Sequence, residues 1–462
     1  MSRCLTLLIA AMATTALTAA EPIKLHPANP HYFEFRGRPT VLITSGEHYG
    51  AVLNGKFDYS RYLNTLREHG LNLTRTFSGT YREIPGSFNI EENTLGPEPV
   101  DFVCPWARSD QPGCADGGNK FDLHRWNDAY FARLKDFVTQ AGERGIVVEY
   151  VLFCVLYDDG LHQHSPMNAA NNIQGIGKIK REEFLAMQEP ALHDVQMKFV
   201  QKVVGELRDF ENVYFEICNE PYFTNVTKEW SEAVSKKIAA TEADLSAKHL
   251  IAQNIANGTQ EVKEPNPLVS ILNFHYAHPP DAVAQNFGLN RVIGDDETGF
   301  DGTGDDFYRR EAWDFILAGG AVFSNLDYSF SVTHPDGTKQ YTKSPGGGSP
   351  TLRKQLKVLS DFIHGCDFVR MRPENALIRS ELPEGVTVRL LANAGKEYAA
   401  YLQGGDQLTL SLELPAGRYT ATWFETRDGS MLGEQSISHS GGEAELKSPA
   451  YKGEAALKLV AE

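Results

Sequence analysis

The chain has 462 residues, of which 42% are hydrophobic and 23% charged, and its formal net charge at pH 7 is −16. This composition indicates a globular protein with a large core and excludes a disordered or fibrous chain. The acidic balance argues against nucleic acid and anionic membranes as partners, because both attract basic surfaces. The length exceeds one ordinary domain and favours two.

Residues 1–20 have the pattern of a secretory signal peptide. Arg3 precedes an apolar stretch from Leu5 to Met12, and a run of small residues ends at Ala20. This stretch is too short to serve as a membrane span, and no later stretch approaches twenty uninterrupted apolar residues. We therefore expect cleavage near Ala20 and export to the periplasm or the medium, without a membrane anchor.

Residues 21–39 predict a hairpin that caps the lower end of the domain that follows. Over residues 40–372, apolar strand-like runs alternate with amphipathic helical stretches, which is typical of a parallel sheet wrapped by helices. The expected strands are 41–44, 71–77, 146–153, 213–217, 250–255, 269–274, 291–294 and 321–323, and the expected helices are 58–69, 126–144, 193–210, 227–249, 306–317 and 351–363. Eight such strands predict an α/β fold of the (β/α)8 TIM-barrel type.

Two long insertions interrupt the pattern, at 78–122 and at 154–181. Both are expected to be loops, and their length favours a walled pocket with exo action over an open groove. Cys104 and Cys114 bracket a segment of the first insertion that is rich in Pro, Gly and Asp. In an oxidising compartment this pair is a candidate disulfide.

The composition changes in the last part of the chain, residues 373–462. Short alternating segments are separated by Gly-Gly, Pro-Ala-Gly and Asp-Gly turns, and no long helical pattern occurs. This pattern predicts a small antiparallel β-sandwich. We expect it to be a packed accessory domain.

Two carboxylates follow expected strands. Glu220 lies in an Asn-Glu-Pro triplet after the run 213–217, and Glu297 ends an Asp-Asp-Glu triplet after the run 291–294. Parallel barrels display their chemistry at these strand ends, and glycoside hydrolysis needs a carboxyl pair. The spacing alone leaves two alternatives open: Glu220 as a helix cap, and the acidic segment around Glu297 as a solvated loop or calcium site.

These residues resemble the clan-A glycoside hydrolases, which are retaining barrel enzymes with an Asn-Glu acid/base after strand four and a Glu nucleophile after strand seven. The resemblance spans roughly residues 40–365. It implies that Glu220 is the acid/base and Glu297 the nucleophile, with carboxyls about 5 to 5.5 Å apart, a raised pKa at Glu220 and no organic cofactor. It also implies an oligosaccharide or polysaccharide substrate. The supporting residues that match the family are Arg75, Asn219, His275 and Tyr276.

A shift of one residue in strand seven would put Asp296 in the place of Glu297. Because neighbouring side chains of a strand alternate, we expect only one of the two to face the sugar. Many clan members carry a tryptophan platform after strand eight, which this chain lacks. Tyr328 is the candidate for that place, and Asp327, Glu47, His48 and Tyr157 are further candidates for substrate binding.

Two other functions compete with this one. The first is a non-catalytic carbohydrate-binding barrel, and the second is a metal-dependent hydrolase that uses the acidic segment and the loop histidines. His162 and His164 lack matched ligands nearby in the sequence, so no metal is expected. The sugar, its linkage and the oligomeric state are left open by the sequence.

Overall fold

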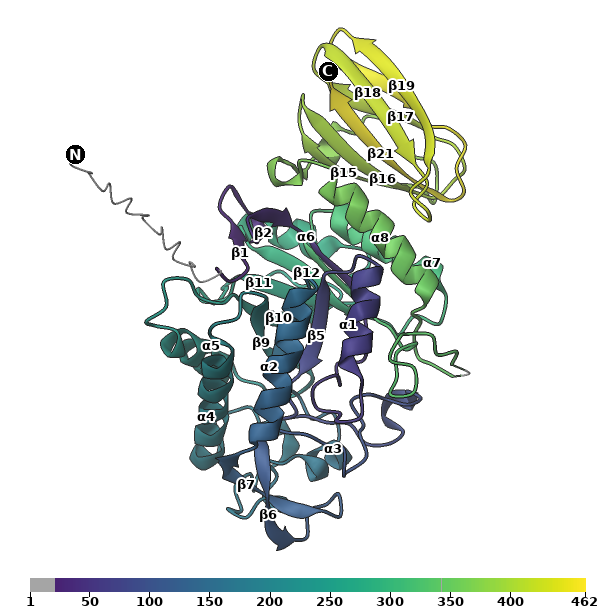
Figure 1. Ribbon diagram of the computed structural model, residues 1–462. Coiled ribbons are helices and arrows are strands. Elements are labelled where there is room, and N and C mark those ends of the chain that lie inside the picture. The colour runs from purple at the N-terminus through teal and green to yellow at the C-terminus, as the bar shows by residue number, and fades with distance from the viewer. Residues whose placement is uncertain (1–20, 342) are drawn as a thin grey trace, which may run out of the picture.

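The computed structural model describes residues 21–341 and 343–462, so the predicted signal peptide lies outside the described residues. The chain folds into a barrel followed by a β-sandwich, which lies beside helices α7 and α8 of the barrel (Figure 1). Within the described part of the chain, no helix is long and apolar enough to cross a membrane.

Eight parallel strands form the barrel sheet in the order β4-β13-β12-β11-β10-β9-β8-β5. The expected (β/α)8 fold is thereby confirmed, and most strand residues are buried because helices cover the outside of the sheet. The strands are β4 (Leu42–Gly46), β5 (Leu73–Phe77), β8 (Val147–Cys154), β9 (Val213–Asn219), β10 (Ile251–Asn257), β11 (Ile271–His275), β12 (Val292–Thr298) and β13 (Val322–Leu326).

Helices alternate with these strands, and several begin at a side-chain cap. Asp58, Thr227 and Ser349 each accept a hydrogen bond from a backbone N–H of the first helical turn. The helices are α1 (Tyr59–Glu68), α2 (Asp128–Glu143), α3 (Asp159–His164), α4 (Pro190–Leu207), α5 (Lys228–Thr241), α6 (Asp281–Asn286), α7 (Asp305–Leu317) and α8 (Pro350–His364). Short 3₁₀ turns are η1 (Ser87–Asn89), η2 (Arg181–Glu183), η3 (Pro221–Phe223), η4 (Phe287–Leu289), η5 (Phe368–Arg370) and η6 (Asn375–Leu377).

Helix α5 is shorter than expected. It ends at Thr241, and the rest of the expected helix is a loop held by Glu242, whose carboxylate accepts the backbone N–H of His249 at 3.0 Å. A side chain that bonds a backbone group seven residues away stabilises the loop instead of a further helical turn.

The barrel closes between β4 and β5 through a side chain. Asn72, just before β5, accepts the Ile43 N–H at 2.8 Å and donates to the Val41 carbonyl at 2.8 Å. Its amide thus replaces ladder bonds between the first and second strands, which otherwise pair only with their other neighbours.

An antiparallel sheet of β1 (Lys24–His26), β2 (Asn29–Phe35) and β3 (Arg38–Thr40) lies at the N-terminal end of the barrel strands. Arg36, in its turn, donates to the Gly142 carbonyl at 2.8 Å and to Glu211 at 2.7 Å. Gly142 and Glu211 precede β8 and β9. The sheet therefore covers the end of the barrel opposite to the one where strand-end side chains gather.

The first insertion was expected to be a loop, but part of it forms regular structure. It contains a hairpin of β6 (Trp106–Pro112) and β7 (Asn119–Trp126), in which the Trp106 and Trp126 rings stack at 6.3 Å. The predicted Cys104–Cys114 disulfide is wrong in this structure, because both thiols are free. Most of the residues between the two cysteines form strand β6. The Cys104 thiol donates a hydrogen bond to the Trp106 carbonyl at 3.4 Å.

The C-terminal region has two antiparallel sheets around its own apolar core. The larger sheet has the order β14-β15-β16-β21-β18-β19, and the smaller is β17-β20. The strands are β14 (Arg372–Pro373), β15 (Thr387–Asn393), β16 (Glu397–Gln403), β17 (Thr409–Leu414), β18 (Gly417–Phe424), β19 (Met431–His439), β20 (Gly442–Lys447) and β21 (Glu454–Ala461). The larger sheet packs on α7, where Trp313 stacks on Tyr401 at 5.6 Å.

Candidate active site

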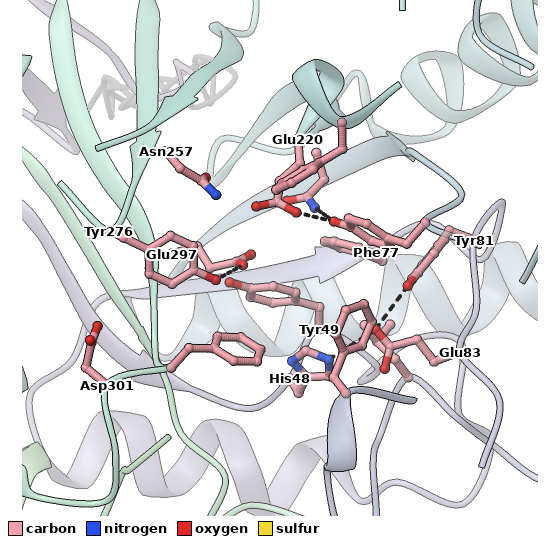
Figure 2. Close-up of a pocket in the computed structure, with 16 residues that line it drawn as sticks. His48, Tyr49, Phe77, Tyr81, Glu83, Glu220, Asn257, Tyr276, Glu297 and Asp301 are labelled. Atoms are coloured by element: carbon pink, nitrogen blue, oxygen red, sulfur yellow. Dashed lines mark hydrogen bonds and ion pairs between the residues drawn. The ribbon is translucent and has the colours of Figure 1, made fainter. Parts of the chain in front are cut away.

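A cavity of about 510 Å³ opens where the barrel strands end (Figure 2). Its position is the one where barrel enzymes carry their catalytic groups. The loops after seven of the eight strands contribute to its lining, which consists of His48, Tyr49, Phe77, Tyr81, Glu83, Phe88, Leu95, Tyr157, Asn219, Glu220, Phe223, Asn257, Tyr276, Glu297, Phe300 and Asp301.

Glu220 directly follows β9 and is 6% exposed. Its backbone is left-handed, with φ of +48°, and its N–H donates to Asn254 Oδ1 at 3.2 Å. The carboxylate accepts hydrogen bonds from the Tyr157 hydroxyl and from Tyr222 at 3.4 Å, and His275 Nδ1 lies 3.2 Å from its Oε1. The backbone turn and these partners aim the carboxyl into the cavity.

Glu297 lies near the end of β12 and is also 6% exposed. Arg75 donates to its Oε2 at 3.0 Å, and the Tyr276 hydroxyl donates to its Oε1 at 2.8 Å. Arg75 and Tyr276 therefore hold one oxygen of this carboxylate each.

His275 lies between the two carboxyls. Its Nδ1 is 3.2 Å from Glu220 Oε1 and 3.6 Å from Glu297 Oε1. One oxygen of each carboxylate and this nitrogen all lie within 4.8 Å of one another. Glycosidases with carboxyls this close attack the sugar directly, whereas inverting enzymes hold them about 6.5 to 9.5 Å apart.

The expected raised pKa at Glu220 is not found. Burial raises the pKa of this carboxyl, but the hydrogen bonds from His275 and Tyr157 and the charge of Arg75 outweigh burial, so its pKa is lowered. The sequence did not reveal Tyr157 as a donor to this acid. A role as proton donor therefore requires that bound substrate weakens these contacts.

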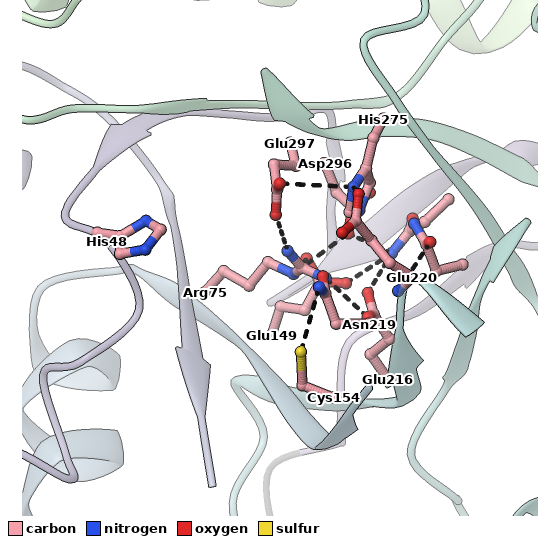
Figure 3. A network of polar contacts seen from close by, with 12 residues as sticks. His48, Arg75, Glu149, Cys154, Glu216, Asn219, Glu220, His275, Asp296 and Glu297 are labelled. Carbon is pink, nitrogen blue, oxygen red and sulfur yellow. Dashed lines mark hydrogen bonds and ion pairs between the residues drawn. The ribbon is translucent and has the colours of Figure 1, made fainter. Parts of the chain in front are cut away.

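Below the cavity, Arg75 is the centre of a buried polar network (Figure 3). Its guanidinium lies 2.7 Å from Glu216, 3.2 Å from Asp296 and 3.9 Å from Glu149. The Asn273 amide donates to all three carboxyls at 2.7 to 3.0 Å. All of these side chains are almost fully buried.

The pKa values of the carboxyls in this network are shifted in opposite directions. Burial raises the pKa of Glu149 and Asp296 well above the ordinary range, and the charge of Glu216 adds to the rise. The pKa of Glu216 is lowered, because Arg75 outweighs the effect of burial. Arg75 thus favours the charged form of Glu216, whereas burial favours the protonated forms of Glu149 and Asp296. Oxygens of Glu149, Glu216 and Asp296 lie within 4.8 Å of one another, and Arg75 and Asn273 supply N–H groups to them.

Glu149, Glu216 and Asn273 escaped the sequence analysis, although a signal was present. Each is a polar residue inside an otherwise apolar strand, β8, β9 or β11. Buried charges of this kind are rare unless they are paired.

Five of the predicted substrate-binding residues do not line the cavity; Arg75 and His275 lie beneath it, and the other three make contacts elsewhere. Glu47 accepts the backbone N–H groups of Gly50 and Ala51, both at 3.0 Å, and so shapes its own loop. Asp327 accepts from Arg353 at 2.5 Å and from Ser45 at 2.9 Å, all buried. The Tyr328 ring lies against Phe300, with ring centroids 6.2 Å apart, and of the two only Phe300 lines the cavity.

The other predicted residues are gathered here. His48, Tyr157, Asn219 and Tyr276 line the cavity, and Arg75 and His275 lie directly beneath it. The residues that the sequence analysis missed are Phe77, Tyr81, Glu83, Phe88, Leu95, Phe223, Asn257, Phe300 and Asp301. Four of these come from the first insertion, whose length was the only sequence signal for them.

The alternative acidic site after β12 does not gather its carboxyls on one point. Asp306 pairs with Arg309 at 2.5 Å, and Asp305 accepts from Ser349 at 2.6 Å. His162 and His164 lie in α3. Neither belongs to a group of close metal-ligating side chains among residues 21–341 and 343–462.

Three comparisons place this fold among known proteins. A family model described as a domain of unknown function (DUF6298) matches residues 99–279, a segment that includes Glu220 and His275 but ends before Glu297. No curated protein matches the chain.

Several solved structures share the architecture. One described as a putative glycoside hydrolase from Bacteroides vulgatus ATCC 8482 has a TM-score of 0.67 and 13% identity, over 96% of this chain and 82% of that one. A second, described as a glycoside hydrolase, has a TM-score of 0.64 and 12% identity, over 96% and 97%. A glycoside hydrolase family 5 structure from Bacteroides vulgatus ATCC 8482 has a TM-score of 0.62 and 12% identity, over 95% and 93%. The chain therefore shares the fold of these solved structures, a barrel fold of the kind that the resemblance implied.

Proposed function

We propose that this protein is an exported retaining glycoside hydrolase that cleaves a β-linked glycoside. The short separation of Glu220 and Glu297, with oxygens within 4.8 Å, supports this function most strongly. Direct attack by one carboxylate needs this spacing. The different partners of the two groups support different roles, since Arg75 donates a hydrogen bond to Glu297 at 3.0 Å, whereas Glu220 accepts from Tyr157 and Tyr222.

In the first step, Glu297 attacks the anomeric carbon while Glu220 gives its proton to the leaving oxygen. A glycosyl ester forms on Glu297, and the leaving group departs as an alcohol. In the second step, Glu220 takes a proton from water, which attacks the same carbon and releases the Glu297 carboxylate. The two inversions retain the configuration.

The proximity of the two carboxyls also supports the change of role at Glu220. A negative charge on Glu297 favours the protonated form of Glu220, and formation of the ester removes that charge. Glu220 then loses its proton more readily and acts as the base. Asn219 and Tyr276, which line the cavity, are the proposed partners for sugar hydroxyls near the reacting carbon.

The first test uses Glu220→Gln and Glu297→Gln on a panel of aryl β-glycosides. Glu297→Gln should lose most turnover on every substrate. Glu220→Gln should lose about 10²- to 10⁴-fold on poor leaving groups and less on activated aryl groups, which need no proton. Asp305→Asn, which lies outside the cavity, is the control. Full activity of either Gln variant would remove that residue's role.

The stereochemistry of the first product separates this function from its rivals. NMR of the reaction should show the β-anomer of the free sugar before mutarotation. Binding of glycans without any cleavage would instead support a non-catalytic barrel, and loss of activity on chelation would support a metal-dependent hydrolase.

A further inference from the structure

The cavity has two sides with different chemistry. The residues that follow Glu220 in the chain flank the acid, and Tyr222 bonds both Glu220 and Asn257. Because the leaving group takes its proton from Glu220, it departs on this side. Figure 2 shows His48 and Glu83 at the opposite edge from Glu220 and Asn257. The sugar that is attacked by Glu297 therefore extends toward His48 and Glu83.

The segment 83–95 forms a wall of the cavity, to which Glu83, Phe88 and Leu95 contribute. The Glu83 N–H donates to the Leu95 carbonyl at 2.8 Å, and the Leu95 N–H donates to Asn93 Oδ1 at 2.9 Å. The Asn93 amide in turn donates to the Glu83 carboxylate. Lys339 also holds the segment, through a hydrogen bond to the Glu91 carbonyl at 3.0 Å. These bonds make the wall a fixed part of the fold.

His48 presents an unused polar atom at this wall. Its Nε2 lies 3.3 Å from Glu83 Oε1, which also accepts the Tyr81 hydroxyl at 3.1 Å. The residue is only 8% exposed and lines the cavity, and its Nδ1 is buried without a hydrogen-bond partner among the described residues. A buried polar atom without a partner is costly, so native structures rarely leave one unless a ligand uses it.

The charge of His48 fits a donor role. Burial opposes the imidazolium, but the Glu83 carboxylate outweighs burial, and the pKa of His48 is raised. A protonated imidazole carries an N–H on both nitrogens; Nε2 faces Glu83, and Nδ1 has no partner among the described residues.

We propose that His48, held by Glu83, binds a hydroxyl of the terminal sugar and that this wall ends the sugar-binding side, so the protein removes single sugar residues from non-reducing ends. This inference rests on the proposed glycosidase function. It names the substrate as a chain end with a free hydroxyl opposite the scissile bond, and it excludes attack inside a chain, because a further sugar residue would collide with the fixed wall.

The test begins with the wild-type protein and oligosaccharides of the sugar whose aryl glycoside it cleaves. The first products should be the monosaccharide and an oligosaccharide that is shorter by one unit. Early products of intermediate length would overturn the inference while leaving the glycosidase function intact. Failure to cleave any aryl glycoside would overturn both.

The role of His48 is tested by His48→Ala and Glu83→Gln on aryl glycosides and on their monodeoxy analogues. His48→Ala should reduce kcat/KM by about 10- to 100-fold on the full sugar, the range expected for a charged hydrogen bond. The effect should vanish on the one analogue that lacks the bound hydroxyl. His124→Ala, an exposed histidine on β7, is the matched control and should be unchanged. An equal loss on every analogue would show that His48 is structural and would overturn its role.

Discussion

Four residues that line the cavity have left-handed backbones, and one of them is Phe88, with φ of +54°. Tyr49, Glu220 and Tyr276 have φ of +60°, +48° and +52°, a region that costs a non-glycine residue about 1–2 kcal/mol. Each is held by a tertiary bond; for example, the Tyr276 N–H donates to the Glu297 carbonyl at 2.9 Å. Such strain is typical of functional sites, where the backbone must aim a side chain away from the direction of its strand.

At the same scale, Tyr157 should set the upper pH limit of activity. Its hydroxyl donates to the Glu220 carboxylate and favours the ionised form. Tyr157→Phe removes this bond, so the pKa of Glu220 should rise and the acid should stay protonated to higher pH. We expect the alkaline limb of the kcat/KM profile to move to higher pH. Tyr59→Phe on α1 should leave the limb in place, and a shift to lower pH would contradict the assignment of Glu220 as the acid.

Among the elements, β12 departs from regular alternation. Its pairing with β11 and with β13 shifts register around Asp296, which marks a β-bulge. The extra residue lets both Asp296 and Glu297 approach Arg75, at 3.2 and 3.0 Å, while Asp295 turns toward α7. Of these two neighbouring carboxylates, Glu297 lines the cavity and Asp296 does not.

The contact of β12 with α7 should make stability depend on pH. Burial raises the pKa of Glu311 to about 8, despite a hydrogen bond from Thr298, and raises that of Asp295. The folded protein thus binds more protons than the unfolded chain between about pH 4.5 and 8, and its stability falls as pH rises through this window. Each unit of difference in pKa is worth about 1.4 kcal/mol.

Glu311→Gln should remove this loss while keeping the hydrogen bond from Thr298. Its melting temperature relative to the wild type should therefore increase from pH 5 to pH 8. Glu229→Gln, on the exposed side of α5, provides the baseline. An unchanged difference between the two pH values would mean that Glu311 does not titrate in this range.

The Asn72 side chain contributes two hydrogen bonds to the junction of β4 and β5, beside the backbone bond from the Asn72 N–H to the Ile43 carbonyl at 3.3 Å. Asn72→Ala leaves the Ile43 N–H and the Val41 carbonyl without their partners, each costing about 1–3 kcal/mol when buried. Urea unfolding should show a lower midpoint with an unchanged slope. Asn72→Asp keeps the acceptor for Ile43 and should lie between Ala and the wild type. Equal stability of all three would show that water or the backbone replaces the amide.

In the whole molecule, a buried ion cluster joins the barrel to the sandwich. Glu454 of β21 accepts from Arg309 of α7, from Arg310 at 3.2 Å and from the Tyr401 hydroxyl at 3.1 Å. Arg389 of β15 also pairs with Asp314 of α7 at 2.7 Å. Helix α7 follows the strand that carries Glu297, so the sandwich supports the element next to the catalytic strand.

Glu454→Ala should therefore destabilise the whole protein. It leaves the buried Arg309 without its carboxylate partner on β21, a change that costs about 3–5 kcal/mol. Calorimetry should show a lower melting temperature, and separation of one transition into two would show that the cluster couples the domains. Glu443→Ala, on the exposed side of β20, should have no effect. A wild-type melting curve for Glu454→Ala would contradict the coupling.

The sequence by itself determined the order of strands and helices, because burial of parallel strands leaves apolar runs that can be read locally. It also placed Glu220 and Glu297 at the ends of strands, since each directly follows or ends such a run. Arg75, His275 and Tyr276 were reached only through resemblance to a family. Their positions at strand ends are visible in the chain, but their contacts are not.

Only the tertiary structure decided which polar residues meet. Glu149, Glu216 and Asn273 lie on three different strands and converge on Arg75 because barrel closure turns their side chains to one axis. Asp327 meets Arg353 instead of substrate for the same reason, since its direction depends on how β13 and α8 pack. Local patterns record burial along one strand, whereas partners across the barrel depend on register, bulges and loop packing that no single segment encodes.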